Sequence, residues 1–265
     1  MSRYIRRIVK KILPQSVQSF IQCKLKERND WRIMEKTLAQ YNNMCSPDIP
    51  GFVILDPYVK TDRIFNGIQY YSQVYQDYYL DHYVFHEKEN GIFLDVGGND
   101  PIYINNTYFF ELNRNWTGLA FEPMPKMHQR WKESRKVQCI QVALGSRKGE
   151  MEFCEYEEDY MSGLVSNVDY NGKVAKNYKV NIVTLGSILK KYKITHVDFI
   201  SLDVEGAELD VLNGIDFSAV VIDYFVIENN KGFEKEQEIR RFLIKKHYKL
   251  KAKLWIDEIW EREKD

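Results

Sequence analysis

The sequence has no excess of either charge, few cysteines and no long apolar run. Lysine plus arginine and aspartate plus glutamate each number 38 among 265 residues, so the composition carries no electrostatic signature of a nucleic-acid partner. The four cysteines lack CxxC spacing, which argues against a zinc site or a disulfide framework and favours reduced thiols. The apolar runs are too short to cross a bilayer and no signal peptide is visible, so we expect a cytoplasmic protein.

The first 65 residues differ in pattern from the rest. Within residues 1–14, apolar residues recur at helical spacing and basic residues fill the remaining face, which predicts a basic amphipathic helix. Such a helix either lies peripherally on the inner face of a membrane or packs on the protein body or a partner subunit of a homo-oligomer. Prolines within residues 46–62 indicate a linker. We therefore expect an N-terminal helical extension over residues 1–65 and one larger domain over residues 66–265.

The central pattern of the larger domain is GIFLDVGGNDP, residues 91–101. Residues 92–96 read as an apolar strand that carries Asp95 and runs into Gly97 and Gly98, with a helix expected from about Ile104. Glycines permit a sharp turn and close approach to a ligand, and a following helix offers free N–H groups there. A strand, a glycine turn and a helix also follow one another in α/β folds without binding a ligand there, so this segment alone leaves a ligand role open.

Strand and helix patterns alternate through the rest of the domain. This alternation predicts an α/β fold with a mostly parallel sheet, helices on both faces and a terminal antiparallel hairpin. Residues 155–179 lack clear periodicity and are expected to form a functional loop or lid. The expected strands cover residues 117–122, 137–143, 150–154, 197–203, 220–228, 249–253 and 256–260, and the expected helices residues 72–85, 105–113, 126–134, 188–191 and 234–246.

Several acidic residues stand where strands end. Glu122 closes the strand that follows the glycine turn, at an interval typical of the carboxylate that binds ribose hydroxyls in nucleotide-binding folds. Asp203 ends another apolar strand, at the edge where open α/β sheets bind their ligands. Glu228 ends a third. Glu205 lies in a first helical turn, where an acid also simply complements the helix dipole.

Two cofactors fit a strand, a glycine turn and a strand-end acid. A nicotinamide dinucleotide needs GxGxxG for its pyrophosphate, and DVGGNDP lacks the third glycine. S-adenosylmethionine has no phosphate. Its ribose would meet Glu122, its amino-acid end the turn from Asp95 to Asn99, and its adenine the region of Val142 and Ala143.

Several further motifs accompany the glycine turn. In chain order the motifs are YSQVYQD, FLDVGGNDP, NNTYFFE, WTGLAFEP, VALG, SGL, VTL and DFISLDVEGAELDVLNG. Together they resemble the FkbM family of S-adenosylmethionine-dependent methyltransferases. The resemblance extends from about Tyr70 to Trp260 and rests most heavily on the last motif.

The resemblance implies a class I, Rossmann-like methyltransferase fold with a seven-stranded sheet, and O-methylation of hydroxyl groups, often on sugars or secondary metabolites. It places Asp203 beside the sulfonium and the acceptor. The other residues that it implies at the cofactor are Gln73, Asp77, Asp95, Gly97, Asn99 and Glu122. Gly98 stands where many relatives have alanine, and the residues before about Asp62 lie outside the resemblance.

For such a reaction the enzyme chiefly aligns an acceptor oxygen with the methyl group and excludes water. A general base adds to this, and Asp203, Glu205 and Glu228 are the candidates. We predict no metal site, although a carboxylate pair holding a divalent cation is an alternative. The leading hypothesis is an O-methyltransferase acting on a saccharide or saccharide-linked metabolite, for example in surface polysaccharide biosynthesis. The alternatives are a nicotinamide-dependent oxidoreductase and a non-catalytic nucleotide-binding subunit.

Overall fold

The structure is a computed structural model that describes residues 64–65, 68–73, 75–156, 162–164, 173–229, 233–254 and 256–264. The predicted basic helix and the linker lie outside these residues, so the boundary at residue 65 stays a prediction. Within the described ranges, no helix combines the length and apolar character needed to cross a membrane.

Seven strands form the main sheet in the order β12-β13-β11-β10-β3-β4-β5. Strand β13 runs antiparallel to both of its neighbours, and the other neighbouring strands pair in parallel. The predicted mostly parallel sheet with a terminal antiparallel pair is therefore confirmed. The strand bounds are β3 Ile92–Val96, β4 Thr117–Phe121, β5 Gln138–Ile140, β10 His196–Leu202, β11 Val221–Glu228, β12 Tyr248–Leu254 and β13 Asp257–Arg262.

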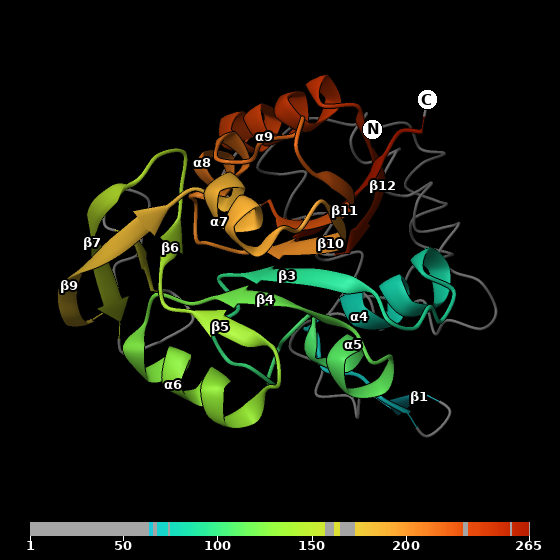
Figure 1. The fold of residues 1–265 in the computed structure, drawn as a ribbon, viewed down its shortest axis with the longest axis horizontal. Helices are drawn as coiled ribbons and strands as arrows, with labels where there is room; N and C mark the ends of the chain where they lie inside the picture. The colour runs from blue at the N-terminus through green and yellow to red at the C-terminus, as the bar shows by residue number, and fades with distance from the viewer. Residues whose placement is uncertain are drawn as a thin grey trace, which may run out of the picture.

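Helices cover both faces of this sheet (Figure 1). On one side lie α7 (Leu185–Tyr192), α8 (Glu208–Asn213) and α9 (Phe233–Lys245). On the other side lie α4 (Gln76–Tyr79), the π-helix η1 (Leu80–Val84) and α5 (Tyr108–Asn113), with α6 (Pro125–Ser134) beside the edge strand β5. A small hairpin of β1 (Ile64–Phe65) and β2 (Ile68–Gln69) precedes them.

The two-residue period of the central strands divides the core into two different layers. Phe93 and Phe199 face a layer rich in aromatic side chains, where the Phe110 ring lies 4.9 Å from Trp116 and 5.2 Å from Phe199. Leu94 and Ile200 face a mainly aliphatic layer beneath α7, α8 and α9. Because both faces of β3 and β10 are covered, both strands are mainly apolar, and polar residues follow them.

A second sheet of four strands, in the order β6-β9-β7-β8, corrects two sequence predictions. Residues 137–143 are not one strand, because the chain leaves the main sheet after Ile140 and enters β6 (Ala143–Leu144) of the second sheet. Residues 155–179 are not one irregular loop either. Strand β9 (Val174–Val183) pairs antiparallel with β7 (Gly149–Tyr156), which also pairs with β8 (Gly163–Leu164).

Two predicted helices are shorter than expected. The segment 72–85 forms one turn of α-helix followed by η1, in which the Phe85 amide bonds to the Leu80 carbonyl at 2.8 Å. Helix α5 begins at Tyr108 because the Asn105 side-chain oxygen accepts from the amides of Thr107 and Tyr108, at 2.9 and 2.8 Å. Asparagine forms such local bonds readily, and they compete with an earlier helical start.

Gly97 provides a test of the turn after β3. Its φ is +79°, and a Cβ atom there would lie 1.8 Å from the backbone oxygen of Asp203. We predict that Gly97→Ala lowers the free energy of unfolding by about 2 kcal/mol or more, measured by urea denaturation. The control is Gly149→Ala, because a Cβ there meets nothing within 4 Å. Equal and small effects of both substitutions would contradict this packing.

Candidate functional site

The register of the main sheet brings three polar strand ends to one level. Val96, the last residue of β3, pairs with Phe121 on one side and Leu202 on the other. One further bond on each side extends these ladders, from the Gly97 amide to the Phe121 carbonyl and from the Asp203 amide to the Val96 carbonyl, each 3.0 Å. Gly97, Glu122 and Asp203 are therefore neighbours at the carboxyl edge of the sheet, where open α/β folds place their ligands.

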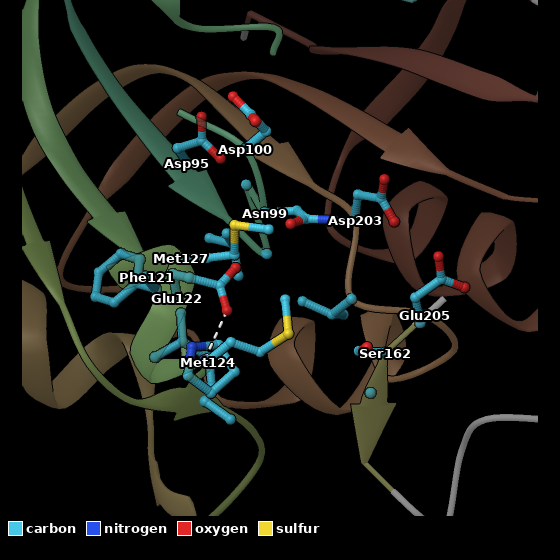
Figure 2. Close-up of a pocket in the computed structure, with 18 of the residues that line it drawn as sticks. Asp95, Asn99, Asp100, Phe121, Glu122, Met124, Met127, Ser162, Asp203 and Glu205 are labelled. Carbon is cyan, nitrogen blue, oxygen red and sulfur yellow. Dashed lines mark hydrogen bonds between the residues drawn. The ribbon is translucent and has the colours of Figure 1, made fainter. Parts of the chain in front are cut away.

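A pocket of about 350 Å³ opens at this edge, and its lining includes residues of β6, β7 and β8 from the second sheet. Figure 2 shows the pocket. A volume of this size suits a small organic ligand. The wall formed by the second sheet and α6 is largely apolar, and the wall formed by the loop after β3 and the end of β10 is polar. The apolar wall includes Met124, Met127, Ala143, Phe153 and Leu164, and the polar wall includes Asn99, Asn106, Ser201, Asp203 and Glu205.

Glu122 is a buried carboxylate that faces this pocket (Figure 2). Its Oε1 accepts a 2.7 Å bond from the Met124 amide. Burial raises the pKa of Glu122 to about 8, and the nearby acids Asp95 and Glu155 add to the shift, while backbone amides of Met124 and Asn99 oppose it. A ligand that donates hydrogen bonds to the ionised carboxylate would therefore stabilise the negative charge that burial disfavours.

Asn99 lies in the turn after β3, and Asp95 lies near the end of that strand. The side-chain oxygen of Asn99 is buried and has no hydrogen-bond partner within the described part of the chain. It lines the pocket beside Gly97 and Gly98, so a ligand with a cationic or N–H donor group would complete it. Burial raises the pKa of Asp95, whose Oδ2 accepts from Thr107 Oγ1 at 2.5 Å and Asn105 Nδ2 at 3.0 Å. Asp95 thereby fixes the loop as well as lining the pocket.

Arg135 at the end of α6 is the second anchor of this loop. Its Nε donates to Glu111 Oε2 at 2.8 Å, its Nη1 to the Pro101 carbonyl at 2.8 Å, and its Nη2 to Thr107 Oγ1 at 3.1 Å. The guanidinium is fully buried. The loop between β3 and α5 is thus held by buried polar contacts, which become costly when one partner is removed.

Asp203 and Glu228 are neighbouring acids at the ends of β10 and β11. Asp203 lines the pocket and is exposed to solvent. Desolvation by the surrounding protein raises the pKa of Asp203 above its usual range, and the charges of Glu228 and Glu205 and a hydrogen bond to Glu228 add to the shift. Glu228 is buried behind Asp203, and oxygens of Asp203, Glu208 and Glu228 lie within 4.8 Å of one another.

The structure brings most of the predicted site residues into this pocket and leaves three outside its lining. The lining includes Asp95, Gly97, Gly98, Asn99, Glu122, Val142, Ala143, Asp203 and Glu205. Outside it are Gln73, Asp77 and Glu228, of which Glu228 contacts Asp203. Asp77 is fully buried in a turn, where it accepts bonds from the amides of Tyr71, Ser72 and Tyr78 at 2.6, 3.1 and 2.9 Å.

Sequence reasoning missed several residues at or behind the pocket. Met124 lines the pocket, and its position directly after Glu122 and Pro123 could have predicted this from the sequence. Arg135 carries no sequence signal. Gln76 and Asp257 are buried and bonded to each other, and their approach joins α4 to β13 across the fold. Burial raises the pKa of Asp257 to about 6, and the bond from Gln76 opposes the shift.

Comparison with known proteins decides the family. A family profile described as "Methyltransferase FkbM domain" matches residues 95–250. The chain belongs to this family. A relative from the fungus Beauveria bassiana (strain ARSEF 2860), "Methyltransferase 1", is 26% identical over 169 residues, which cover 54% of this chain and 67% of the relative. This FkbM protein is accordingly an S-adenosylmethionine-dependent methyltransferase, and its seven-stranded sheet is consistent with a Rossmann-like methyltransferase fold.

The residues at the pocket fit S-adenosylmethionine. The Glu122 carboxylate suits a ribose diol, which supplies two hydroxyl donors. The unpaired Asn99 oxygen suits the α-ammonium group. The apolar wall around Ala143 and Phe153 suits a flat adenine, and no cluster of backbone amides for a pyrophosphate is needed.

Two arginines of α6 provide a test of the loop anchors. We predict that Arg135→Met lowers the free energy of unfolding by about 3 to 5 kcal/mol, because it leaves buried acceptors without their donor. The control is Arg130→Met on the same helix. Arg130 bonds to Asp100 at 2.7 Å but is 46% exposed, so its loss costs about 1 kcal/mol or less. Chemical denaturation measures both, and comparable losses would contradict the anchoring role of Arg135.

Proposed function

We propose that this FkbM protein is an O-methyltransferase that transfers a methyl group to a hydroxyl of a saccharide or saccharide-linked metabolite, as in surface polysaccharide biosynthesis. The observation that carries the proposal is the position of Asp203, which lines the pocket at the carboxyl edge of the sheet and contacts the buried Glu228. The family assignment replaces the two alternatives considered from the sequence, a nicotinamide-dependent oxidoreductase and a non-catalytic nucleotide-binding subunit.

The cofactor arrangement follows from the two walls of the pocket. Glu122 accepts hydrogen bonds from the ribose hydroxyls. Asn99 holds the amino-acid end, together with the turn at Gly97 and Gly98. The adenine packs near Val142 and Ala143. Because Gly97 and Asp203 are neighbours at the strand ends, this orientation directs the sulfonium toward Asp203. S-adenosylmethionine, when bound, supplies an activated methyl group at that sulfur.

Asp203 then removes the proton of the acceptor hydroxyl. A general base works best when its pKa lies near the working pH, and burial together with Glu228 and Glu205 raises the pKa of Asp203 toward that range. Glu228 does not line the pocket, so it acts as a positioning residue that orients Asp203 and shares its proton. Glu205 lines the pocket and is the second carboxylate within reach of an acceptor.

A saccharide acceptor is supported by the polar wall. Asn106 donates to Ser201 at 3.0 Å, and both line the pocket with Asp203 and Glu205. Carboxylate, amide and hydroxyl groups on one wall match an acceptor that carries several hydroxyls.

The pKa of Glu122 gives a pH test of the ribose contact. Bound hydroxyls favour the ionised carboxylate, so binding must release a proton wherever free Glu122 is protonated, which is below about pH 8. We predict that affinity for S-adenosylhomocysteine increases from pH 5.5 to about pH 8 and then levels off. Titration calorimetry in buffers of different ionisation enthalpy measures both the affinity and the proton release.

The matched variant is Glu122→Gln, which keeps the shape of the side chain but carries no charge at any pH. Its affinity should be nearly independent of pH and should fall at least about tenfold below that of the wild type at pH 8.5, because a hydrogen bond to a charged group is lost. An unchanged pH profile in this variant would remove Glu122 from the ribose site.

Substitutions of Asp203 and Glu228 should differ in their effects on kcat and on the pH–rate profile. We predict that Asp203→Asn reduces kcat by roughly 10²- to 10⁴-fold, the usual contribution of a general base, while affinity for S-adenosylhomocysteine, which lacks the sulfonium charge, is kept. Glu228→Gln removes a negative charge beside Asp203, so the acidic limb of the pH–rate profile should move to lower pH. Transfer of labelled methyl groups to a saccharide panel measures the rates. An Asp203→Asn enzyme with full kcat would exclude the base role.

A further inference from the structure

The loop between β3 and α5 presents two apolar side chains at the mouth of the pocket. Tyr103 is 65% exposed and Ile104 is 40% exposed, and both belong to the pocket lining. Exposed apolar residues are common singly, but an adjacent pair at the edge of a binding pocket is a candidate contact for a ligand.

The backbone at this pair is held in an unfavourable conformation. Ile104 has a φ of +55°, which is rare for a β-branched residue and stores conformational strain. Polar contacts on both sides fix the loop. Asp100 Oδ1 accepts from the amides of Ile102 and Tyr103, each at 2.9 Å, and Asn105 Nδ2 donates to Asp95 at 3.0 Å. These contacts therefore keep the side chains of Tyr103 and Ile104 exposed to solvent, although the burial of these two side chains contributes little to stability.

The position of the loop points to the acceptor side of the pocket. One end is tied to α6 through Asp100 and Arg130, and the other to β10 through the 3.0 Å bond from Asn106 to Ser201. Ser201 lies two residues before Asp203, the proposed base. The pair therefore lies on a stretch of the pocket lining that leads directly to Asn106 and Ser201 of the polar wall.

We propose that Tyr103 and Ile104 form an acceptor platform, against which the acceptor packs the C–H face of a pyranose ring while its hydroxyls reach Asp203 and Asn106. A pyranose has an apolar C–H face and a polar rim, and the platform and the polar wall supply the matching surfaces. This inference rests on the proposed function. It adds that these two residues help to determine which acceptor is bound.

The test measures cofactor and acceptor separately. Calorimetry with S-adenosylhomocysteine reports the cofactor site. Saturation-transfer NMR with the S-adenosylhomocysteine complex reports glycoside binding, with the methyl glycosides of rhamnose, fucose, galactose, mannose and N-acetylglucosamine as probes and catechol as a non-sugar aromatic probe. The variants are Tyr103→Ala, Tyr103→Phe and Ile104→Asn. The matched control for the last is Ile244→Asn, because Ile244 is 61% exposed on α9 and does not line the pocket.

We expect saturation of ring C–H protons in at least one glycoside with the wild type, and a fall of about tenfold in its affinity with Tyr103→Ala, because apolar contact area is lost. Tyr103→Phe should keep most of the affinity, and S-adenosylhomocysteine should bind equally to all variants. Ile104→Asn should also weaken the glycoside without lowering the melting temperature, since asparagine tolerates a positive φ. Ile244→Asn should change neither affinity.

Three results would overturn the platform. The first is S-adenosylhomocysteine binding with no glycoside bound, or with catechol alone bound, which leaves the methyltransferase standing and removes the pyranose. The second is glycoside binding that is unchanged in Tyr103→Ala and Ile104→Asn. This result would keep the saccharide acceptor but show that it binds away from these two residues. The third is failure of the wild type to bind S-adenosylhomocysteine, which removes the proposed cofactor site together with the platform.

Discussion

The parallel register of β3 between β4 and β10 is the constraint on which the rest of the site depends. Val96 pairs with Phe121 and Leu202, so the next residue of each strand stands at the same level of the sheet. Gly97 has no Cβ and therefore lets the Asp203 carbonyl approach closely. A slip of one residue in either pairing would exchange core and pocket side chains and separate Glu122 from Asp203.

Around this edge the protein buries acids that favour function over stability. Glu122 and Asp95 have a raised pKa, chiefly because of burial. An acid whose pKa is higher in the folded state than in the unfolded state stabilises the fold less as pH rises through that interval. For Glu122 the interval runs from its ordinary value of 4.5 to about 8, so the unliganded enzyme carries this cost near neutral pH. A ligand that favours the carboxylate offsets the cost, which couples binding to stability.

Much of the fold could be predicted from the sequence because the central strands are buried on both faces. Residues 92–96 and 197–203 appear as apolar runs that end in polar residues, and this pattern located the pocket edge. The pairing of β9 with β7 was missed, although Tyr178, Val180 and Ile182 alternate with polar residues as a half-buried strand requires. The site was less predictable where it depends on contacts between distant segments. The burial of Arg135 against the Pro101 carbonyl and the bond between Gln76 and Asp257 carry no local signal. The position of Glu228 behind Asp203, outside the pocket lining, also follows from strand order and not from the acid itself.

A crystal structure of the complex with S-adenosylhomocysteine tests the central claim most directly. The account predicts the ribose hydroxyls on the Glu122 carboxylate, the amino group on Asn99, the adenine against Ala143 and the sulfur facing Asp203. A ligand bound at this edge in the reverse orientation, or bound elsewhere with Glu122 and Asp203 uncontacted, would contradict it.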